Sequence, residues 1–171
     1  LLDPVESLYY RDSRFFDQKT ANGKKVFWSR GNGWVFAGLA RVLRDLPAKD
    51  PQRARYEMLF RDMAERLMAL QKPDGTWPAS LLDAQDPPGP ESSGTGFFTF
   101  GLAWGANNGL LDRAVVWSTV RAGWNALVKA VQPNGRLGYV QPIGFAPEPA
   151  TANTSEPYGA GAFLLAASEL H

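Results

Sequence analysis

The sequence predicts an all-α protein of the α/α toroid type, in which this chain supplies about half of the ring. Two observations support this prediction. A Gly-x-Gly segment followed by an apolar stretch occurs three times, at 31–33, 94–96 and 159–161, with offsets of 63 and 65 residues. Helical patterns of two kinds, one amphipathic and one almost uncharged, alternate along the chain. We therefore expect one domain, residues 1–171, built from three similar repeat units.

A mostly apolar helix is expected to follow each Gly-x-Gly segment. These helices are predicted near 32–46, 94–107 and 160–169. The second of them carries no charged side chain, and small residues such as Gly101 and Ala103 recur along it. Small residues let helix backbones approach one another, and a helix that is apolar all round belongs in the interior. We expect these to be the inner helices of the ring.

Two amphipathic segments alternate with the inner helices. Residues 53–71 place Phe60 and Leu67 on one helical face and Arg and Glu on the other, and residues 115–131 follow the same pattern. The Pro-Asp-Gly turn at 73–75 ends the first of them. Both read as outer helices. Three inner and two outer helices amount to roughly half of a closed ring of six hairpins.

Composition excludes several classes of chemistry. The chain has 18 Lys plus Arg and 17 Asp plus Glu, a net charge of +1, so no nucleic-acid partner is indicated. It has no Cys and one His, His171, which argues against thiol, histidine-triad and histidine-metal sites, and we expect no metal and no cofactor. Six Trp, five Tyr and ten Phe instead favour the binding of sugars.

The sequence gives little information on the compartment. The longest uncharged stretch, 92–111, contains five Gly and several polar side chains, so no membrane span is expected. No basic segment followed by an apolar one opens the chain, so no secretion signal is visible. Localisation stays open between a bacterial cytoplasm and periplasm.

Four segments resemble the C-terminal half of the unsaturated glucuronyl and rhamnogalacturonyl hydrolases. They are Phe-Trp-Ser-Arg-Gly-Asn-Gly-Trp at 27–34, Gln-x-x-Asp-Gly-x-Trp at 71–77, Glu-Ser-Ser-Gly-Thr at 91–95, and the run 103–112. The first segment is the specific one, and the resemblance covers nearly the whole chain. It implies a six-hairpin α/α barrel that hydrates the carbon-carbon double bond of an unsaturated uronyl residue. The implied partners are an oligosaccharide substrate and the missing N-terminal half of the barrel, or a second copy of the chain.

The resemblance also implies that the catalytic Asp of the family lies upstream of residue 1. Asp12 is the weak candidate for an assisting acid within the chain, and the alternative is an exposed Asp paired with Arg11 or Arg14. Relatives often carry a substrate-contacting His where this sequence has Arg11. Either Arg11 replaces that contact, or this branch of the family binds a different sugar.

The binding candidates at the first inner helix are Arg30, Trp34, Trp28 and Asn32. Arg30 could grip the carboxylate of the substrate in a bidentate pair, or tie down a loop by bonding backbone carbonyls. Trp34 and Trp28 could stack on sugar faces, although core packing is the better interpretation for Trp28. Asn32 belongs to the same motif, and Gly31 and the glycine after it are expected to shape the entry into the helix.

Further candidates open the second inner helix. Glu91, Ser92 and Thr95 could face the substrate cavity, although capping of the helix N-terminus explains a Glu or Ser there equally well. Glu156 occupies the matching place in the third repeat.

Two alternative functions remain open on the residues alone. The same helical hairpins would suit a non-catalytic helical-repeat protein that binds a peptide on its concave face. Another sugar enzyme on an α/α barrel, an epimerase or a lyase, would use the same fold, but such enzymes generally depend on His.

Overall fold

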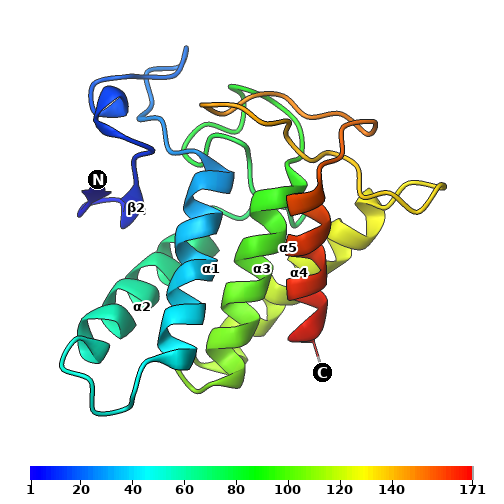
Figure 1. Cartoon of the computed structure of the whole chain (residues 1–171). Coiled ribbons are helices and arrows are strands. Elements are labelled where there is room, and N and C mark those ends of the chain that lie inside the picture. The colour runs from blue at the N-terminus through cyan, green and yellow to red at the C-terminus, as the bar shows by residue number, and fades with distance from the viewer. Residues whose placement is uncertain (171) are drawn as a thin grey trace.

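The computed structural model describes residues 1–170, and five α-helices form the main body of the described chain (Figure 1). The helices are α1 (Ser29–Asp45), α2 (Arg53–Ala69), α3 (Ser92–Asn107), α4 (Arg113–Ala130) and α5 (Pro157–Ser168). Ahead of them lie a small antiparallel pair, β1 (Leu2–Asp3) and β2 (Leu8–Tyr9), and a single 3₁₀ turn, η1 (Ser13–Phe15). These three short elements were not expected from the sequence.

The helices form two layers. In Figure 1, α1, α3 and α5 lie side by side and run in the same direction, with α3 in the middle. Helix α2 packs behind α1, and α4 packs against α3. The helices that follow the Gly-x-Gly pattern are therefore the inner ones, and the two amphipathic helices α2 and α4 are the outer ones, as the patterns predicted. Two of the inner helices, α3 and α5, carry no charged side chain, whereas α1 carries four, including Arg41 and Arg44. Each inner helix begins two or three residues earlier than expected, at residues 29, 92 and 157.

The glycines of the repeat lie inside the first turns of the inner helices, not in entry turns as we had expected. They are required there because the helices touch. A Cβ on Gly94 would lie 2.1 Å from Oγ of Ser29 on α1, and one on Gly96 would lie 2.8 Å from Cβ of Ala162 on α5. Distances this short leave no room for a side chain. The repeat of Gly-x-Gly therefore sets the spacing of the inner layer.

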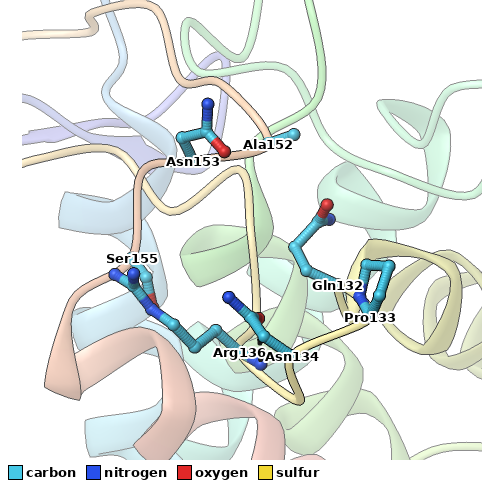
Figure 2. A pocket seen from close by; sticks show the side chains of 7 residues that line it. All are labelled: Gln132, Pro133, Asn134, Arg136, Ala152, Asn153 and Ser155. Carbon is cyan, nitrogen blue, oxygen red and sulfur yellow. Dashed lines mark hydrogen bonds between the residues drawn. The ribbon is translucent and has the colours of Figure 1, made fainter.

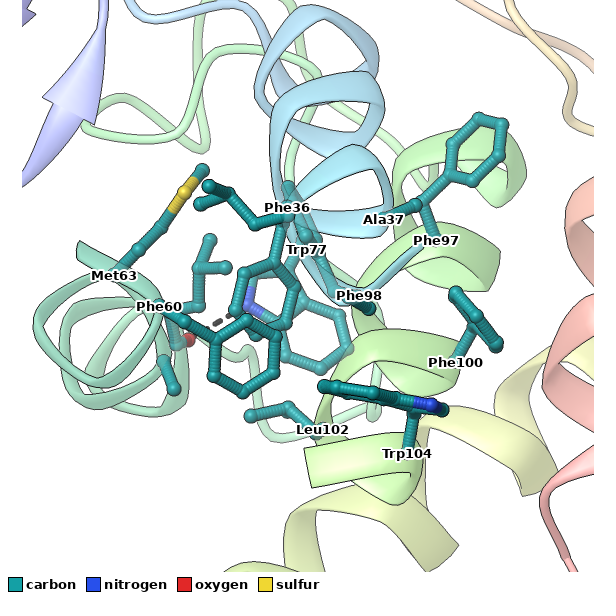
Figure 3. Packing of buried hydrophobic residues seen from close by; sticks show 14 of the residues in the cluster. Phe36, Ala37, Phe60, Met63, Trp77, Phe97, Phe98, Phe100, Leu102 and Trp104 are labelled. Carbon is teal, nitrogen blue, oxygen red and sulfur yellow. Dashed lines mark hydrogen bonds between the residues drawn. The ribbon is translucent and has the colours of Figure 1, made fainter. Parts of the chain in front are cut away.

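The core lies between the two layers and is rich in aromatic side chains (Figure 3). Phe36 of α1 stacks on Phe60 of α2 with 4.6 Å between ring centroids, and Phe98 of α3 meets Trp77 edge to face at 5.4 Å. The indole N–H of Trp77 donates to the carbonyl of Leu67 at 2.7 Å, so the buried ring leaves no polar group unpaired. Each such ring contributes about 1.5 to 3 kcal/mol by burial.

The long connections all lie at one end of the molecule. The segments 70–91 and 131–156 join the outer helices to the following inner ones, and both lie at the N-terminal ends of the inner helices (Figure 1). The connections at the opposite end are shorter. The long loops therefore lie around the N-terminal ends of the three parallel inner helices α1, α3 and α5.

Among residues 1–170, no helix combines the length and the apolar character that a bilayer crossing requires.

Candidate functional site

The candidate site lies where α1, α3 and α5 begin. The three repeats contain α1, α3 and α5 respectively, and each contributes the first turn of its helix to this end. The connection 131–156 runs over these turns (Figure 1). Three helix N-termini at one rim place three positive dipole ends together, which favours a negatively charged group nearby. Arg30 and Trp34 lie on α1 at this end.

Gln141 joins the three repeats at the rim. It is fully buried, and its backbone carbonyl accepts hydrogen bonds from Nη1 of Arg30 and from Oη of Tyr158, each at 2.5 Å. Its backbone N–H donates to Oε1 of Glu91 at 3.3 Å. Arg30 belongs to the first repeat, Glu91 to the second and Tyr158 to the third, so one glutamine holds all three helix starts in register.

The side chain of Gln141 also forms two hydrogen bonds. Its Oε1 accepts from Nε1 of Trp28 at 2.9 Å, and its Nε2 donates to the carbonyl of Ala146 at 2.7 Å. The second bond fixes the loop 142–149, whose Ile143 and Phe145 are 81% and 72% exposed. The amide therefore sets the position of an apolar loop tip beside the first helix.

Arg30 is buried between two aromatic rings. Its Cζ lies 4.4 Å from the ring centroid of Trp28 and 4.7 Å from that of Tyr158. Nη2 donates to the carbonyl of Pro142 at 3.0 Å, and Nη1 donates to Oη of Tyr158 at 3.1 Å in addition to the carbonyl of Gln141. These contacts match the loop-tying alternative. A guanidinium has five N–H donors, and the Nε–H and one Nη2–H of Arg30 have no partner among residues 1–170.

Trp34 is the exposed aromatic side chain of the rim. It lies on α1, one turn after Arg30, and is 50% exposed. Its ring centroid lies 4.3 Å from that of Phe97 on α3 and 6.4 Å from that of Tyr158 on α5. Neighbouring rings thus fix Trp34 on one side and leave the rest of it open, which is the geometry of a stacking surface for a sugar.

Trp28 and Asn32 have structural contacts. Trp28 is half-buried under Arg30 and held by its bond to Gln141. The side chain of Asn32 is 1% exposed, accepts from the N–H of Tyr9 at 2.8 Å, and donates to the carbonyls of Tyr9 and Trp28 at 3.0 Å. Both amide hydrogens of Asn32 are occupied, so it holds β2 against α1 and has none free for a sugar.

Glu91, Ser92 and Thr95 follow the capping alternative. Glu91 is 1% exposed, and its carboxylate accepts from the N–H groups of Ser93 and Gly94 at 2.9 and 2.6 Å. Ser92 donates its hydroxyl to the carbonyl of Gly138 at 2.8 Å, and Thr95 donates to the carbonyl of Glu91 at 2.7 Å. Ser92 and Thr95 line a cavity between α3 and α4 and do not join Trp34. Glu156 is the N-cap residue of α5 without a side-chain capping bond.

Arg11 and Asp12 form an ion-paired corner of the rim. Asp12 pairs with Arg11 and with Arg14, the latter at 2.8 Å, and Cζ of Arg11 lies 5.2 Å from the ring centroid of Phe145. The hydrogen bond from Arg14 holds the pKa of Asp12 well below its usual range. A proton donor needs a raised pKa, so this environment matches the alternative of an ion-paired loop Asp.

Sequence reasoning missed Gln141 and Tyr158 as members of the site. Tyr158 carried a signal, because it occupies the position of Arg30 in the aligned repeat. Gln141 carried only a weak signal, because it is a single amide side chain between an apolar stretch and a proline. Its role depends on bonds to residues 50 and 111 positions away, which no local pattern encodes.

Comparisons with known proteins identify relatives along the whole chain. The sequence profile of Glycosyl Hydrolase Family 88 matches residues 1–171. An unsaturated 3S-rhamnoglycuronyl hydrolase from Alteromonas sp. (strain LOR) is 53% identical over 163 residues, covering 95% of this chain and 40% of that protein. A solved structure of a glycosyl hydrolase family 88 protein from Bacteroides vulgatus is 47% identical, with a TM-score of 0.94 over 98% of this chain and 50% of that chain.

A more distant structure shows the fold alone. The unsaturated glucuronyl hydrolase from Bacillus sp. GL1 is 21% identical, with a TM-score of 0.60 over 85% of this chain and 39% of that chain. The chain thus has the fold of these proteins and spans half, or less, of the length of each of them.

Proposed function

The chain belongs to glycosyl hydrolase family 88, and from this membership we propose that it forms part of a hydrolase acting on unsaturated uronyl oligosaccharides, of the rhamnogalacturonyl or glucuronyl type. The reaction is hydration of the carbon-carbon double bond in the terminal sugar. The hydrated sugar then opens and releases its neighbour. Within this enzyme the chain supplies part of the substrate-binding wall at the starts of α1, α3 and α5.

The single observation behind the binding role is the exposure of Trp34 at the rim. A half-exposed indole is held from one side by Phe97 and Tyr158, so its free face is fixed before any ligand arrives. A sugar ring presents an apolar face of C–H groups, and an aromatic ring with a fixed orientation covers it at low entropic cost.

The buried guanidinium of Arg30 adds the charge that an unsaturated uronate requires. Two of its N–H groups are without a partner in residues 1–170, and the other three anchor it to the carbonyls of Gln141 and Pro142 and to the hydroxyl of Tyr158. Loop anchoring and carboxylate binding are therefore compatible, because they use different hydrogens of the same planar group. In this proposal, the anchored Arg30 presents a rigid edge to the substrate carboxylate.

The proton donor lies on another part of the ring in this proposal. Asp12, the candidate within the chain, is ion-paired with Arg11 and Arg14, and its pKa is lowered by Arg14. Three inner and two outer helices form about half of a six-hairpin ring, in keeping with a relative of which the chain covers 50%. The other half of the barrel, or a second copy of the chain, would complete it.

The test of the binding role is a titration with an unsaturated disaccharide. The purified chain is titrated while tryptophan fluorescence and heat of binding are followed. We expect Trp34→Ala to weaken binding by about fivefold, because an aromatic contact contributes roughly 1 kcal/mol. Unfolding should change little, because half of the side chain is exposed.

The matched control is Trp117→Ala. Trp117 lies on the outer helix α4 beneath Arg113, far from the helix starts that form the rim. It should leave binding of the disaccharide unchanged. Equal binding by wild type, Trp34→Ala and Trp117→Ala would contradict the stacking role. Arg30→Ala should weaken binding by roughly 1.5 to 3 kcal/mol, the contribution of a charge-assisted hydrogen bond.

A further inference from the structure

A cavity of about 250 Å³ lies between α3 and α4, and no residue of α1 or α5 lines it. It is therefore separate from the rim site of Trp34. Its walls come from the turn at 74–76, the start of α3, the end of α4 and the segment around Tyr139. The lining is mostly apolar, which distinguishes this cavity from the polar cavity formed by residues 132–136 and 152–155.

The cavity is built into the packing of α3 on α4. Near the middle of α4 the two helices touch, because a Cβ on Gly123 would lie 2.3 Å from Oγ1 of Thr99. The turn at 74–76 packs on α4 and forms a side wall of the cavity, because a Cβ on Gly75 would lie 2.3 Å from the carbonyl oxygen of Ala122. Toward the end of α4 the residues that line the gap include Ala126 and Ala130, which are too small to fill it.

Tyr139 contributes the aromatic part of the wall under backbone strain. Its φ of 58° lies in the left-handed region, which costs of order 1 kcal/mol or more for a residue other than Gly. Two backbone hydrogen bonds hold it there: its N–H donates to Thr151, and its carbonyl accepts from Ser92, both at 2.8 Å. Strain of this kind is concentrated at ligand sites, and here it places an aromatic residue beside Pro90 and Leu127 in one wall.

Among the described residues, the lysine of the cavity lining has no ion-pair partner, whereas the aspartate of the lining is paired. Lys129 is exposed at the end of α4 and has no ion-pair partner in the described part of the chain, residues 1–170. The hydroxyl of Tyr139 also has no hydrogen-bond partner among those residues. Asp74 is the acid of the lining, but Lys72 at 3.1 Å and the hydroxyl of Thr76 at 2.7 Å already engage its carboxylate. The unpaired groups are thus the ammonium of Lys129 and the hydroxyl of Tyr139. The apolar floor of the cavity consists of Pro90, Ala126, Leu127 and Ala130.

We propose that this cavity is an accessory saccharide site that binds one anionic sugar ring, a hexuronate, of the polysaccharide from which the substrate comes. Tyr139 and the apolar floor contact the C–H face of the sugar, and Lys129 pairs with its carboxylate. The volume lies below the 300 Å³ at which sites for drug-sized ligands begin, so it suits a single ring. The proposal rests on the proposed function for the class of ligand, but neither Trp34 nor Arg30 lines this cavity.

A neighbouring cavity is polar and lacks these features. About 210 Å³ in volume, it is formed by the turn 132–136 and the segment 152–155, and Arg136 runs toward Ser155 across it (Figure 2). No aromatic side chain lines it, so it lacks the apolar surface that a sugar ring requires.

The test is nuclear magnetic resonance of the ¹⁵N-labelled chain with three probes: methyl glucuronide, methyl glucoside and inorganic phosphate. We expect the glucuronide to shift amide signals of residues 126–130 and 139, and the glucoside to bind about tenfold more weakly. Phosphate should not compete, because it has no apolar face. Lys129→Gln should weaken glucuronide binding about tenfold, the effect of one charge-assisted hydrogen bond.

Two further variants make the result decisive. Tyr139→Gly removes the ring and suits the positive φ, so it should abolish binding while the chain stays folded. Lys49→Gln changes an exposed lysine in the α1 to α2 connection and should leave binding unchanged. Unshifted signals at 126–130, equal binding by Lys129→Gln and wild type, or full competition by phosphate would each overturn the proposal. An unsaturated disaccharide reports separately through the Trp34 indole signal, so failure of the proposed function is recognised independently.

Discussion

Arg30 and Gln141 are 111 residues apart in the chain, and Nη1 of Arg30 donates to the carbonyl of Gln141 at 2.5 Å. The bond joins the start of the first inner helix to the loop that precedes the third. Because Gln141 is fully buried and also accepts from Trp28, the rim of the inner layer is one connected polar network inside an apolar surrounding. Such a network is strong when every member is paired and costly when one partner is removed.

Gln141→Ala should therefore destabilise the chain. The substitution removes the bonds of the side chain to Trp28 and to Ala146, and leaves the partly buried indole N–H and carbonyl without these partners. We expect the free energy of unfolding to fall by about 2 to 4 kcal/mol. Chemical denaturation followed by circular dichroism measures it.

Gln18→Ala provides the comparison, since Gln18 is exposed in the N-terminal segment. It should change the free energy of unfolding by less than about 0.5 kcal/mol. If both variants unfold at the same denaturant concentration as the wild type, the network contributes nothing to stability.

Asp3 should make the stability of the chain depend on pH. Burial raises the pKa of this carboxyl, but hydrogen bonds from Lys25, from Tyr10 and from the N–H groups of Val5 and Glu6 outweigh it and hold the pKa at about 2. The value in the unfolded chain is about 3.8, so the ionised form stabilises the fold above that pH. This stability is lost as the pH falls from about 4 to 2.

Asp3→Asn measures this contribution. At pH 7 the variant should lose about 2 kcal/mol of unfolding free energy, and the difference from wild type should shrink as the pH approaches 2. Asp17→Asn, at an exposed position, serves as the control. A difference between wild type and Asp3→Asn that stays constant from pH 7 to pH 2.5 would contradict the linkage.

The purified chain should associate in solution. Apolar side chains are exposed on the first and last inner helices, with Val42 at 43% on α1 and Leu164 at 66% on α5. In a ring, these flanks would pack on neighbouring inner helices. We expect light scattering to show a dimer or larger species that dissociates on dilution.

Leu164→Glu should shift this equilibrium toward the monomer, because it places a charge on the flank of α5. Met58→Glu, which alters an exposed apolar residue on the outer helix α2, should not. A chain that stays monomeric at high concentration, or that responds equally to both substitutions, would argue against half of a ring.

The chain alone should bind an unsaturated disaccharide without hydrolysing it. Arg30 and Trp34 can position a substrate, but neither can deliver a proton to the double bond. Incubation with the disaccharide should leave the ultraviolet absorbance of the double bond constant. Steady loss of absorbance would place the proton donor within the chain, and Asp12→Asn and Glu91→Gln would then identify it.

The sequence by itself determined the order and kind of the helices. Their periodicity is a local property: apolar residues such as Phe60 and Leu67 recur on one face of residues 53–71, and Pro and Gly end the helix. The threefold Gly-x-Gly repeat likewise predicted which helices are inner, because small residues permit close packing wherever they occur. The starts of the inner helices shifted by two or three residues, and the short pair of strands near residue 8 was missed, since pairs this small depend on tertiary contacts.

The tertiary structure decided which polar side chains are free. Local sequence placed Arg30, Asn32, Glu91 and Trp34 near one rim and offered capping as an interpretation of Glu91, which is a local contact. It could not show that the amide of Asn32 is satisfied by Tyr9. Nor could it show that Gln141 holds Arg30. A polar group binds substrate only with donors that the fold leaves unpaired. The bonds that occupy the donors of Asn32 and Arg30 join residues 23 to 111 positions apart, and no local pattern records such contacts.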